Sequence, residues 1–241
     1  MPRSVEIIIP VLNEERALPL CIDTLIEFTA GHPDYDWKIT VADNGSTDTT
    51  PEVIAELGKK YPNVGTLRLE QRGRGRALKR AWLDSDADVR CYMDVDLSTD
   101  IKALPELVGA IANEGYDVAI GSRLSKGSQV IGRKLSREIT SRGYNLLIRL
   151  MFWPSFRDAQ CGFKAVSRRA AENLMPLIKD NAWFMDTEML LLAQAAGYRI
   201  KQVPVRWVDD PDTRVKIAST AWEDVKGLLR LRFKGRPKPA G

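Results

Sequence analysis

Asp94 and Asp96 are the residues whose type and spacing most directly suggest chemistry in this sequence. They follow residues 89–93, which suit a short buried strand, and side chains two positions apart on an extended backbone point the same way. Both carboxylates therefore leave the strand on one side. Hard oxygen ligands in this position suit Mg2+ or Mn2+. Such an ion keeps some of its water ligands and takes further ligands from phosphate oxygens. The pair predicts a metal site that handles a diphosphate.

The same pair has less specific interpretations. Asp-x-Asp is frequent by chance, and two carboxylates at a strand end also serve to cap the next helix or simply face water. The neighbouring elements have to discriminate between these roles.

The elements around the pair alternate in type. Apolar runs predict strands at Val5 to Pro10, Trp37 to Ala42, Val64 to Leu69, Val89 to Met93 and Val118 to Ile120, with helices at about Glu15 to Phe28, Glu52 to Lys60, Ala77 to Leu83 and Leu104 to Asn113. This alternation predicts an α/β fold, with a mostly parallel twisted sheet flanked by helices. Ligands bind at the carboxyl ends of strands in such sheets, and the polar clusters of this sequence fall at those ends.

The second half of the chain is more basic. An amphipathic stretch from Arg137 to Trp153 suits either a helix that faces the core or one that lies in a membrane interface. A strand is expected over Arg199 to Val208 and a last helix over Thr220 to Phe233. We expect one domain over residues 1–233 and a disordered basic tail over residues 234–241.

Composition narrows the function classes. The chain has 241 residues, of which 44% are hydrophobic and 28% charged, as in an ordinary soluble globule. It contains no apolar run near the roughly 20 residues that span a bilayer and no signal-peptide pattern at its start, so we expect a cytoplasmic protein. A formal charge of +4 does not argue for a nucleic-acid partner. The scattered Cys21, Cys91 and Cys161 suggest buried thiols rather than disulfides or a zinc site.

Seven motifs in this order resemble the family 2 glycosyltransferases of the Rossmann-like GT-A fold, specifically the polyprenyl-phosphate sugar synthases typified by dolichyl-phosphate glucose and mannose synthases. The resemblance covers about Val5 to Val208. It rests on Pro10-Val11-Leu12-Asn13-Glu14, Asp43-Asn44-Gly45-Ser46-Thr47-Asp48, Asp94-Val95-Asp96, Gly121-Ser122-Arg123, Asp158-Ala159-Gln160-Cys161-Gly162-Phe163-Lys164, Trp183 with Asp186 and Glu188, and Val203-Pro204-Val205-Arg206-Trp207.

The resemblance implies roles for the acidic and polar motifs. The residues expected to line the nucleotide site are Pro10, Asn13, Glu14, Asp43 and Asp94, with Glu14 near the ribose and Asp43 near the base. Plain helix capping is the alternative for Asn13 and Asp43. Asp94 and Asp96 would hold Mg2+ or Mn2+ against the diphosphate, and Asp96 is the expected direct ligand.

The resemblance also implies roles for the basic residues. Arg123 and Arg137 match positions that contact acceptor or donor phosphate, and Arg133 is a weaker candidate. A solvated surface role is the alternative for any single arginine. Asp186 and Glu188 fall where other family 2 transferases keep a catalytic carboxylate; here they would act catalytically or organise the sugar hydroxyls or the acceptor site. Helix capping by Asp186 is the alternative.

The implied reaction is a direct, inverting transfer of a hexose from a nucleotide sugar to polyprenyl phosphate, giving a β-linked lipid phosphate sugar. The motif Asp158 to Lys164 favours UDP-glucose, while GDP-mannose and UDP-N-acetylhexosamines stay open. Asn44 departs from the family pattern, where a second aspartate is frequent at this position. Because no transmembrane helices follow, the protein is expected on the cytoplasmic face of the membrane, either docked monotopically or through a separate integral membrane partner.

Four other functions compete with this interpretation. A dehalogenase-type phosphatase would carry Asp-x-Asp after its first strand, and a nucleotidyltransferase would carry a glycine-rich loop there, so both fit poorly. A transferase acting on a soluble or cell-wall glycan, and a non-catalytic membrane-binding module, are left as alternatives.

Overall fold

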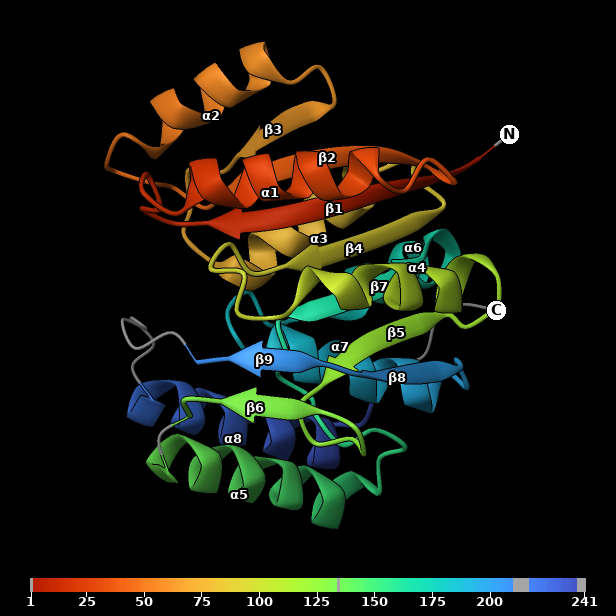
Figure 1. Cartoon of the computed structure of the whole chain (residues 1–241). Coiled ribbons are helices and arrows are strands. Elements are labelled where there is room, and N and C mark those ends of the chain that lie inside the picture. The colour runs from red at the N-terminus through yellow and green to blue at the C-terminus, as the bar shows by residue number, and fades with distance from the viewer. Residues whose placement is uncertain (1, 134, 210–216, 238–241) are drawn as a thin grey trace.

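A seven-stranded sheet organises the chain, whose computed structural model describes residues 2–133, 135–209 and 217–237 (Figure 1). Its strand order is β3-β2-β1-β4-β7-β5-β8. The strands are β1 (Arg3–Val11), β2 (Tyr35–Asp43), β3 (Val64–Arg68), β4 (Val89–Met93), β5 (Val118–Ser122), β7 (Phe163–Ser167) and β8 (Ile200–Pro204). A small second sheet pairs β6 (Gln129–Ile131) with β9 (Arg206–Val208). The predicted α/β arrangement is confirmed.

Helices cover both faces of the sheet (Figure 1). They are α1 (Leu18–Ala30), α2 (Thr50–Lys60), α3 (Arg74–Asp84), α4 (Leu104–Ala112), α5 (Leu135–Phe152), α6 (Arg168–Leu174), α7 (Met185–Ala195) and α8 (Ile217–Phe233), with short 3-10 turns at Ile101–Ala103 and Met175–Leu177. Side chains alternate across the strands, so Ile7 and Ile9 join the core under α1, α2 and α4, whereas Ile8 joins the core under α3, α6 and α7. This is why Ile7, Ile8 and Ile9 are apolar at three successive positions.

The strand order reverses at β1. From β1 the chain moves outward through β2 and β3, then crosses back to place β4 on the other side of β1. In open α/β sheets such a reversal leaves a crevice beyond the carboxyl ends of the two central strands. The loops after Val11 and Met93 therefore meet at the position where such folds bind ligands.

Strand β7 is the antiparallel exception within the sheet. It lies between β4 and β5 and runs against both, with Phe163 paired to Met93. Because its start adjoins the end of β4, the segment before β7 enters the crevice beside Asp94.

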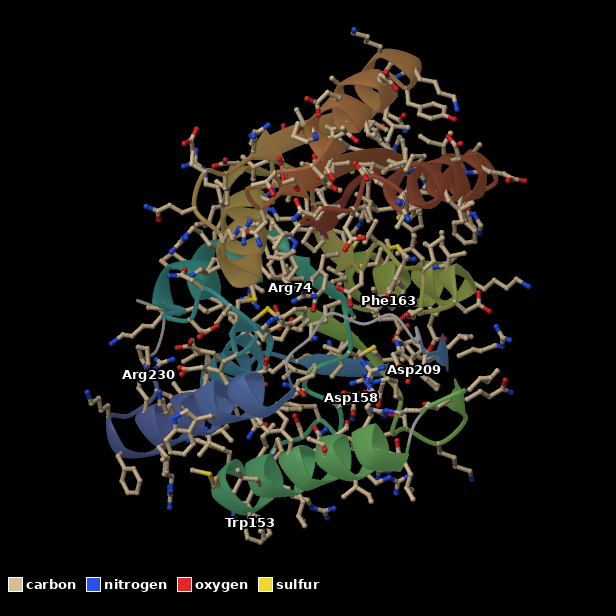
Figure 2. The ribbon with its side chains drawn as sticks, turned by 90° about the vertical axis from the view of Figure 1, so that its left-hand side faces the viewer. Arg74, Trp153, Asp158, Phe163, Asp209 and Arg230 are labelled. Atoms are coloured by element: carbon tan, nitrogen blue, oxygen red, sulfur yellow. The ribbon has the colours of Figure 1, made fainter. Side chains whose placement is uncertain are left out.

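Helices α5 and α8 pack against each other at one end of the molecule, next to β6 and β9 (Figure 1). One face of α5 buries Ile148 and Phe152. Its opposite face carries an exposed apolar stripe, which consists of Leu135, Ile139, Leu146, Leu150 and Trp153. Figure 2 shows Trp153 on the outer side of α5. Thus α5 faces the core on one side and solvent with apolar groups on the other. Among the described helices, none is long and apolar enough to cross a bilayer.

Several predicted boundaries differ from the structure. Helix α1 begins at Leu18 rather than near Glu15, and α3 begins at Arg74, earlier than the expected Ala77. The strand expected over residues 199–208 divides at Val205, where the chain passes from the main sheet to the small one.

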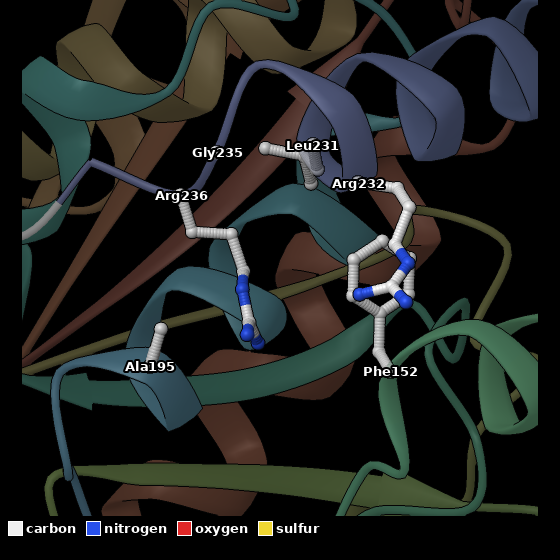
Figure 3. Close-up of a pocket in the computed structure, with 6 residues that line it drawn as sticks. All are labelled: Phe152, Ala195, Leu231, Arg232, Gly235 and Arg236. Carbon is white, nitrogen blue, oxygen red and sulfur yellow. The ribbon is translucent and has the colours of Figure 1, made fainter.

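The chain after α8 keeps contact with the domain as far as Arg236. The Arg236 guanidinium lies 5.6 Å from the centre of the Phe152 ring, beside a pocket of about 310 Å3 (Figure 3). Residues 238–241 of the expected tail lie outside the described residues.

A buried ion pair holds α8 against the domain. Both terminal nitrogens of Arg230 donate to the carboxylate of Glu188, each at 2.8 Å, and Glu188 is fully buried on α7. Glu188 also accepts a hydrogen bond from the backbone of Asp180 at 2.9 Å. Removing the arginine would leave a buried carboxylate without its counter-charge, which is strongly destabilising.

We therefore expect Arg230→Ala to lower the free energy of unfolding by about 3 kcal/mol in urea denaturation. Arg232→Ala is the matched control on the same helix, and an exposed substitution of this kind is expected to cost no more than about 0.5 kcal/mol. Equal losses in the two variants would contradict the anchoring role of the pair.

Candidate active site

The loops after β1 and β2 are joined through Asn13. Its side-chain oxygen accepts the backbone N–H of Thr47 at 2.8 Å, and its own N–H donates to the Ser46 hydroxyl at 2.9 Å. Asn13 has a positive φ of 57°, a conformation that asparagine tolerates better than most residues. It does not cap α1, whose N-cap is Ala17 without a side-chain hydrogen bond, so the capping interpretation is wrong.

Asp43 is buried in the same pair of loops. One oxygen accepts the backbone N–H of Ser46 at 2.9 Å, which closes a turn rather than capping a helix. Its other oxygen, Oδ2, is buried without a hydrogen-bond partner, and the nearest cation, Arg68, is 3.7 Å away. A buried carboxylate oxygen in this state is an available acceptor. Pro10, one residue before the end of β1, is in register with Ala42, and the Glu14 N–H donates to Thr50, so the four predicted nucleotide-site residues of these loops lie together.

Arg74 connects the two acidic motifs. One terminal nitrogen donates to Asp94 at 2.7 Å and the other to Asp186 at 2.9 Å, and the guanidinium lies 4.9 Å from the ring centres of both Tyr92 and Trp183. Only 10% of the Arg74 side chain is exposed. Asp186 therefore neither caps α7 nor stands alone; it belongs to one network with Asp94.

Two glycines explain how α3 brings Arg74 into this position. The N–H of Gly73 donates to the Asn44 side chain at 2.5 Å, and its φ of 152° suits glycine best. A Cβ added to Gly75 would lie 2.7 Å from the Cβ of Met185. Only a glycine lets α3 approach the start of α7 so closely, which places Arg74 next to Asp186.

Asp186 carries a second cation on its far side. Lys164, which is fully buried, lies 3.1 Å from Asp186 Oδ1, and the Tyr92 hydroxyl donates to the same oxygen at 2.5 Å. Burial alone would raise the pKa of Asp186, but Lys164 and Arg74 hold that pKa below its usual value. Burial acts against the charge of Arg74 as well, yet Asp94, Tyr92 and Asp186 keep its pKa above the usual value.

We call Arg74, Tyr92, Asp94, Lys164 and Asp186 the central network. Its two cations and two carboxylates balance in charge, and each of these four side chains is held by an ion pair with a neighbour. This arrangement sets the position of the Asp94 carboxylate.

Gly162 gives Asp94 its space on the other side. A Cβ on Gly162 would lie 1.6 Å from Asp94 Oδ2, and the Gly162 carbonyl accepts the Asp94 N–H at 3.1 Å. Asp96, two residues on, is exposed and accepts the Ser98 N–H at 2.9 Å.

The two carboxylates fit a divalent ion of the Mg2+ or Mn2+ type. Among the described residues, no group of three or more histidine, cysteine, aspartate or glutamate side chains is placed to hold a metal. An ion at Asp94 and Asp96 would therefore need several ligands from phosphate and water, as Mg2+ prefers. Because Arg74 already occupies Asp94 Oδ1, the exposed Asp96 is the better direct ligand.

Arg123 and Arg133 form a second cationic group. Arg123 donates to the buried Asp158 through Nε at 2.8 Å and Nη2 at 2.9 Å, and Asp158 has its pKa lowered to about 2 against the effect of burial because Arg123 is so close. The guanidinium groups of Arg123 and Arg133 lie 5.3 and 5.5 Å from the ring centre of Trp207. Arg133 Nε is buried without a hydrogen-bond partner.

Arg133 donates to Glu138 through Nη1 at 2.9 Å, yet its surroundings disfavour its charge. Burial, followed by the charge of Arg123, lowers the pKa of Arg133. An anion near Trp207 would offset the repulsion from Arg123.

The remaining predicted residues lie outside the central network. Arg137 is paired with Asp209 beside the small sheet, and Glu188 is paired with Arg230. Conversely, sequence reasoning missed Arg74, Tyr92, Lys164 and Gly162 as site residues. The signal for Arg74 was its place between two glycines after a strand, and Lys164 and Gly162 belong to a motif that had been noted without individual roles.

Comparisons with known proteins agree with this geometry. The sequence profile described as Glycosyl transferase family 2 matches residues 6–175. A dolichyl-phosphate beta-glucosyltransferase of Drosophila melanogaster is 32% identical, over 86% of this chain and 67% of that protein, and the one of Dictyostelium discoideum is 29% identical, over 95% and 73%. Glycosyltransferase AglD of Haloferax volcanii is 39% identical over 93% of this chain, which spans only 36% of AglD.

Solved structures show the same fold. Glucosyl-3-phosphoglycerate synthase from Mycobacterium tuberculosis, in complex with Mn2+, UDP and glucosyl-3-phosphoglycerate, superposes with a TM-score of 0.73 at 20% identity, covering 98% of this chain and 81% of that one. The predicted GT-A resemblance is confirmed at the level of the fold.

The contact between Gly162 and Asp94 yields a test by stability. Gly162→Ala is expected to lower the free energy of unfolding by about 1–3 kcal/mol, because the new Cβ has to displace the Asp94 carboxylate. Gly143→Ala is the control: it lies in an exposed turn of α5 with open space around it, and is expected to raise stability by about 0.5–1 kcal/mol. Opposite signs in thermal or urea unfolding support the contact; equal effects refute it.

Proposed function

The chain belongs to glycosyl transferase family 2, and on that premise we propose that it transfers glucose from UDP-glucose to a polyprenyl phosphate of the dolichyl type. The observation that carries the proposal is the placement of Asp94 and Asp96 at the exit of β4, with Asp94 fixed by Arg74 and seated over Gly162. The dolichyl-phosphate glucosyltransferases among its relatives favour this donor and acceptor over GDP-mannose and over a soluble or cell-wall glycan.

The nucleotide is assigned to the loops after β1 and β2. Asp43 Oδ2, buried and without a hydrogen-bond partner, is available to accept a hydrogen bond from the base, and Pro10, Asn13 and Glu14 complete the wall nearer the ribose. Asn44 serves a structural purpose here, because its side chain accepts the Gly73 N–H and so helps position Arg74.

The diphosphate is assigned to the exit of β4. Mg2+ or Mn2+ bound at Asp96 and Asp94 would neutralise the charge that collects on the leaving nucleoside diphosphate. Arg74 fixes Asp94 through Oδ1, so the orientation of the carboxylate is set before the substrate arrives. Preorganisation of this kind avoids reorganisation during the reaction.

Asp186 acts in this scheme as a positioning residue. Its carboxylate oxygens are occupied by Arg74, Lys164 and Tyr92, and its lowered pKa makes it a poor base. A strong base is unnecessary, because the phosphate of the acceptor is already anionic. An oxygen of the acceptor phosphate attacks the anomeric carbon as the bond to the diphosphate breaks. The electron pair leaves with UDP, and the anomeric configuration is inverted.

The acceptor phosphate is assigned to Arg123 and Arg133 beside Trp207. Both guanidinium groups have a carboxylate partner, Asp158 or Glu138, but the buried Nε of Arg133 has no hydrogen-bond partner and is available to a phosphate oxygen, which guanidinium forks suit. Arg137, held by Asp209 at the first turn of α5, lies on the adjoining element as a second candidate for phosphate contact. Glu188 contributes to the acceptor site only indirectly, because its pair with Arg230 anchors α8.

A membrane surface is the expected location of the reaction, on its cytoplasmic face. The apolar stripe of α5 supports this, together with exposed Trp222, Leu229 and Phe233 on α8. Basic residues among them, such as Lys226 and Arg232, would add attraction of about 1 kcal/mol each to an anionic surface. This mode needs no further protein, although a separate membrane partner is compatible with it.

The proposal is tested with radiolabelled UDP-glucose, polyprenyl phosphate and Mn2+ or Mg2+. Label should enter organic-solvent-extractable lipid, and Asp96→Asn should lower kcat/KM at least about 100-fold because the leaving diphosphate loses charge neutralisation. Asp36→Asn, an exposed aspartate at the opposite end of the sheet, is the control and should behave as wild type. Parallel assays with GDP-mannose and UDP-N-acetylglucosamine identify the donor; label only in water-soluble glycan would overturn the acceptor assignment.

A further inference from the structure

A pocket of about 870 Å3 opens beside α5, and four arginines line it. Arg123 comes from the segment after β5, Arg142 and Arg149 from α5, and Arg157 from the segment that leads to β7. We call it the arginine pocket. Its volume lies in the range of roughly 300–1,000 Å3 that small-molecule sites occupy.

The arginine pocket carries an uncompensated positive charge. Its described lining contains no aspartate or glutamate. Arg123 is neutralised by Asp158 and Arg142 is paired with Glu138, but no carboxylate of the described chain pairs with Arg149 or Arg157, which are both exposed. Two unpaired guanidinium groups facing one hollow favour a multiply charged anion.

The rest of the lining combines polar and apolar groups. Hydroxyl and amide side chains come from Ser125, Ser128, Asn145 and Ser155, and apolar ones from Leu124, Leu146, Pro154 and Phe156. Leu146 belongs both to this lining and to the apolar stripe of α5. Because Arg142, Leu146 and Arg149 are spaced four and three residues apart, they share one side of the helix. The pocket therefore joins an anion site to a surface that suits a hydrocarbon chain.

A chain of ion pairs connects the arginine pocket to the residues around Trp207. Glu138 pairs with Arg142 at 2.5 Å and with Arg133 at 2.9 Å. Arg123 both lines the arginine pocket and contacts the Trp207 ring. An anion held by Arg149 and Arg157 thus lies in a pocket that shares Arg123 with the place assigned to the acceptor phosphate.

We propose that the arginine pocket is an entry site for a lipid phosphomonoester, which Arg149 and Arg157 hold before its phosphate moves to Arg123 and Arg133. The inference rests on the proposed function, since it describes how the acceptor of that reaction reaches Arg123 and Arg133. A monoester carries about −1.5 to −2 charges at pH 7, whereas a bilayer phosphodiester carries about one, so the unpaired arginines favour the monoester. The hydrocarbon chain lies along the stripe that includes Leu146 and Leu150.

Binding to vesicles tests the site without any need for sugar transfer. Phosphatidylcholine vesicles are prepared alone, with polyprenyl monophosphate, or with phosphatidylglycerol at equal total charge, and bound protein is measured by sedimentation. Wild type should prefer the monophosphate vesicles. The variant R149A/R157A should bind them roughly 30-fold more weakly, as the loss of two cations at a charged surface implies.

The matched control is R3A/R80A. It lowers the formal net charge from +4 by the same two charges, at exposed arginines on β1 and α3 that do not line the pocket. Circular dichroism and unfolding curves establish that both double variants are folded. The control should retain wild-type binding.

Kinetics separate capture from chemistry. In R149A/R157A the KM for polyprenyl phosphate should rise about tenfold or more, while the KM for UDP-glucose and kcat at saturating acceptor should stay near the wild-type values. R149K/R157K should recover part of the affinity, because lysine restores the charge without the planar fork.

Three results would overturn the inference: equal losses in the two alanine double variants, equal binding of phosphatidylglycerol and monophosphate vesicles, or no binding of monophosphate vesicles by wild type. Failure of the proposed function looks different. If the protein transfers no glucose but still binds monophosphate vesicles through Arg149 and Arg157, the transfer reaction is wrong and the lipid site stands.

Discussion

The ionic contact of Arg74 with both Asp94 and Asp186 is the interaction on which the rest of the site depends. A nearly buried guanidinium between two carboxylates is stable only while both partners stay in place, because loss of either leaves an uncompensated charge away from water. Lys164 balances the second carboxylate, so the central network carries no net charge. Its consequence is a fixed position for Asp94 at the end of β4, where the strand order of the sheet leaves a crevice.

This network also explains a division of labour among the acidic residues. Asp94 and Asp186 are committed to Arg74, and Glu188 is committed to Arg230. Asp96 is exposed at the exit of β4, which makes it the carboxylate best placed to meet an incoming ion and diphosphate. The reaction that we propose needs a fixed anion-handling site more than it needs a base, because its nucleophile arrives ionised.

The arginines in the second half of the chain also form connected groups. Arg123 and Arg133 surround Trp207, and the arginine pocket continues from them to the apolar stripe of α5. A lipid that carries a phosphate meets an apolar surface and cations in that order. The pair of Arg230 with Glu188 holds α8 against α7, and α8 packs against α5, which carries the apolar stripe and lines the arginine pocket.

Much of this was accessible from sequence, because it depends on local patterns. The strand over Val89 to Met93 was predicted with its observed bounds, and the loops after β1 and β2, both predicted from polar motifs, are joined through Asn13. Arg74 was not identified, because its partner Asp186 is 112 positions away in the sequence. Their contact also depends on Gly75, which lets α3 approach α7 closely, and this close approach is a tertiary contact that a local pattern does not reveal. Asn13 had suggested a helix cap; its oxygen serves the neighbouring loop instead, which a local rule does not reveal. The most direct measurement for the central claim is the anomalous density of Mn2+ in crystals grown with UDP-glucose. The account predicts the ion bound to Asp96, with the diphosphate beside it and Arg74 still joining Asp94 to Asp186. An ion and diphosphate lodged away from Asp94 and Asp96 would contradict it.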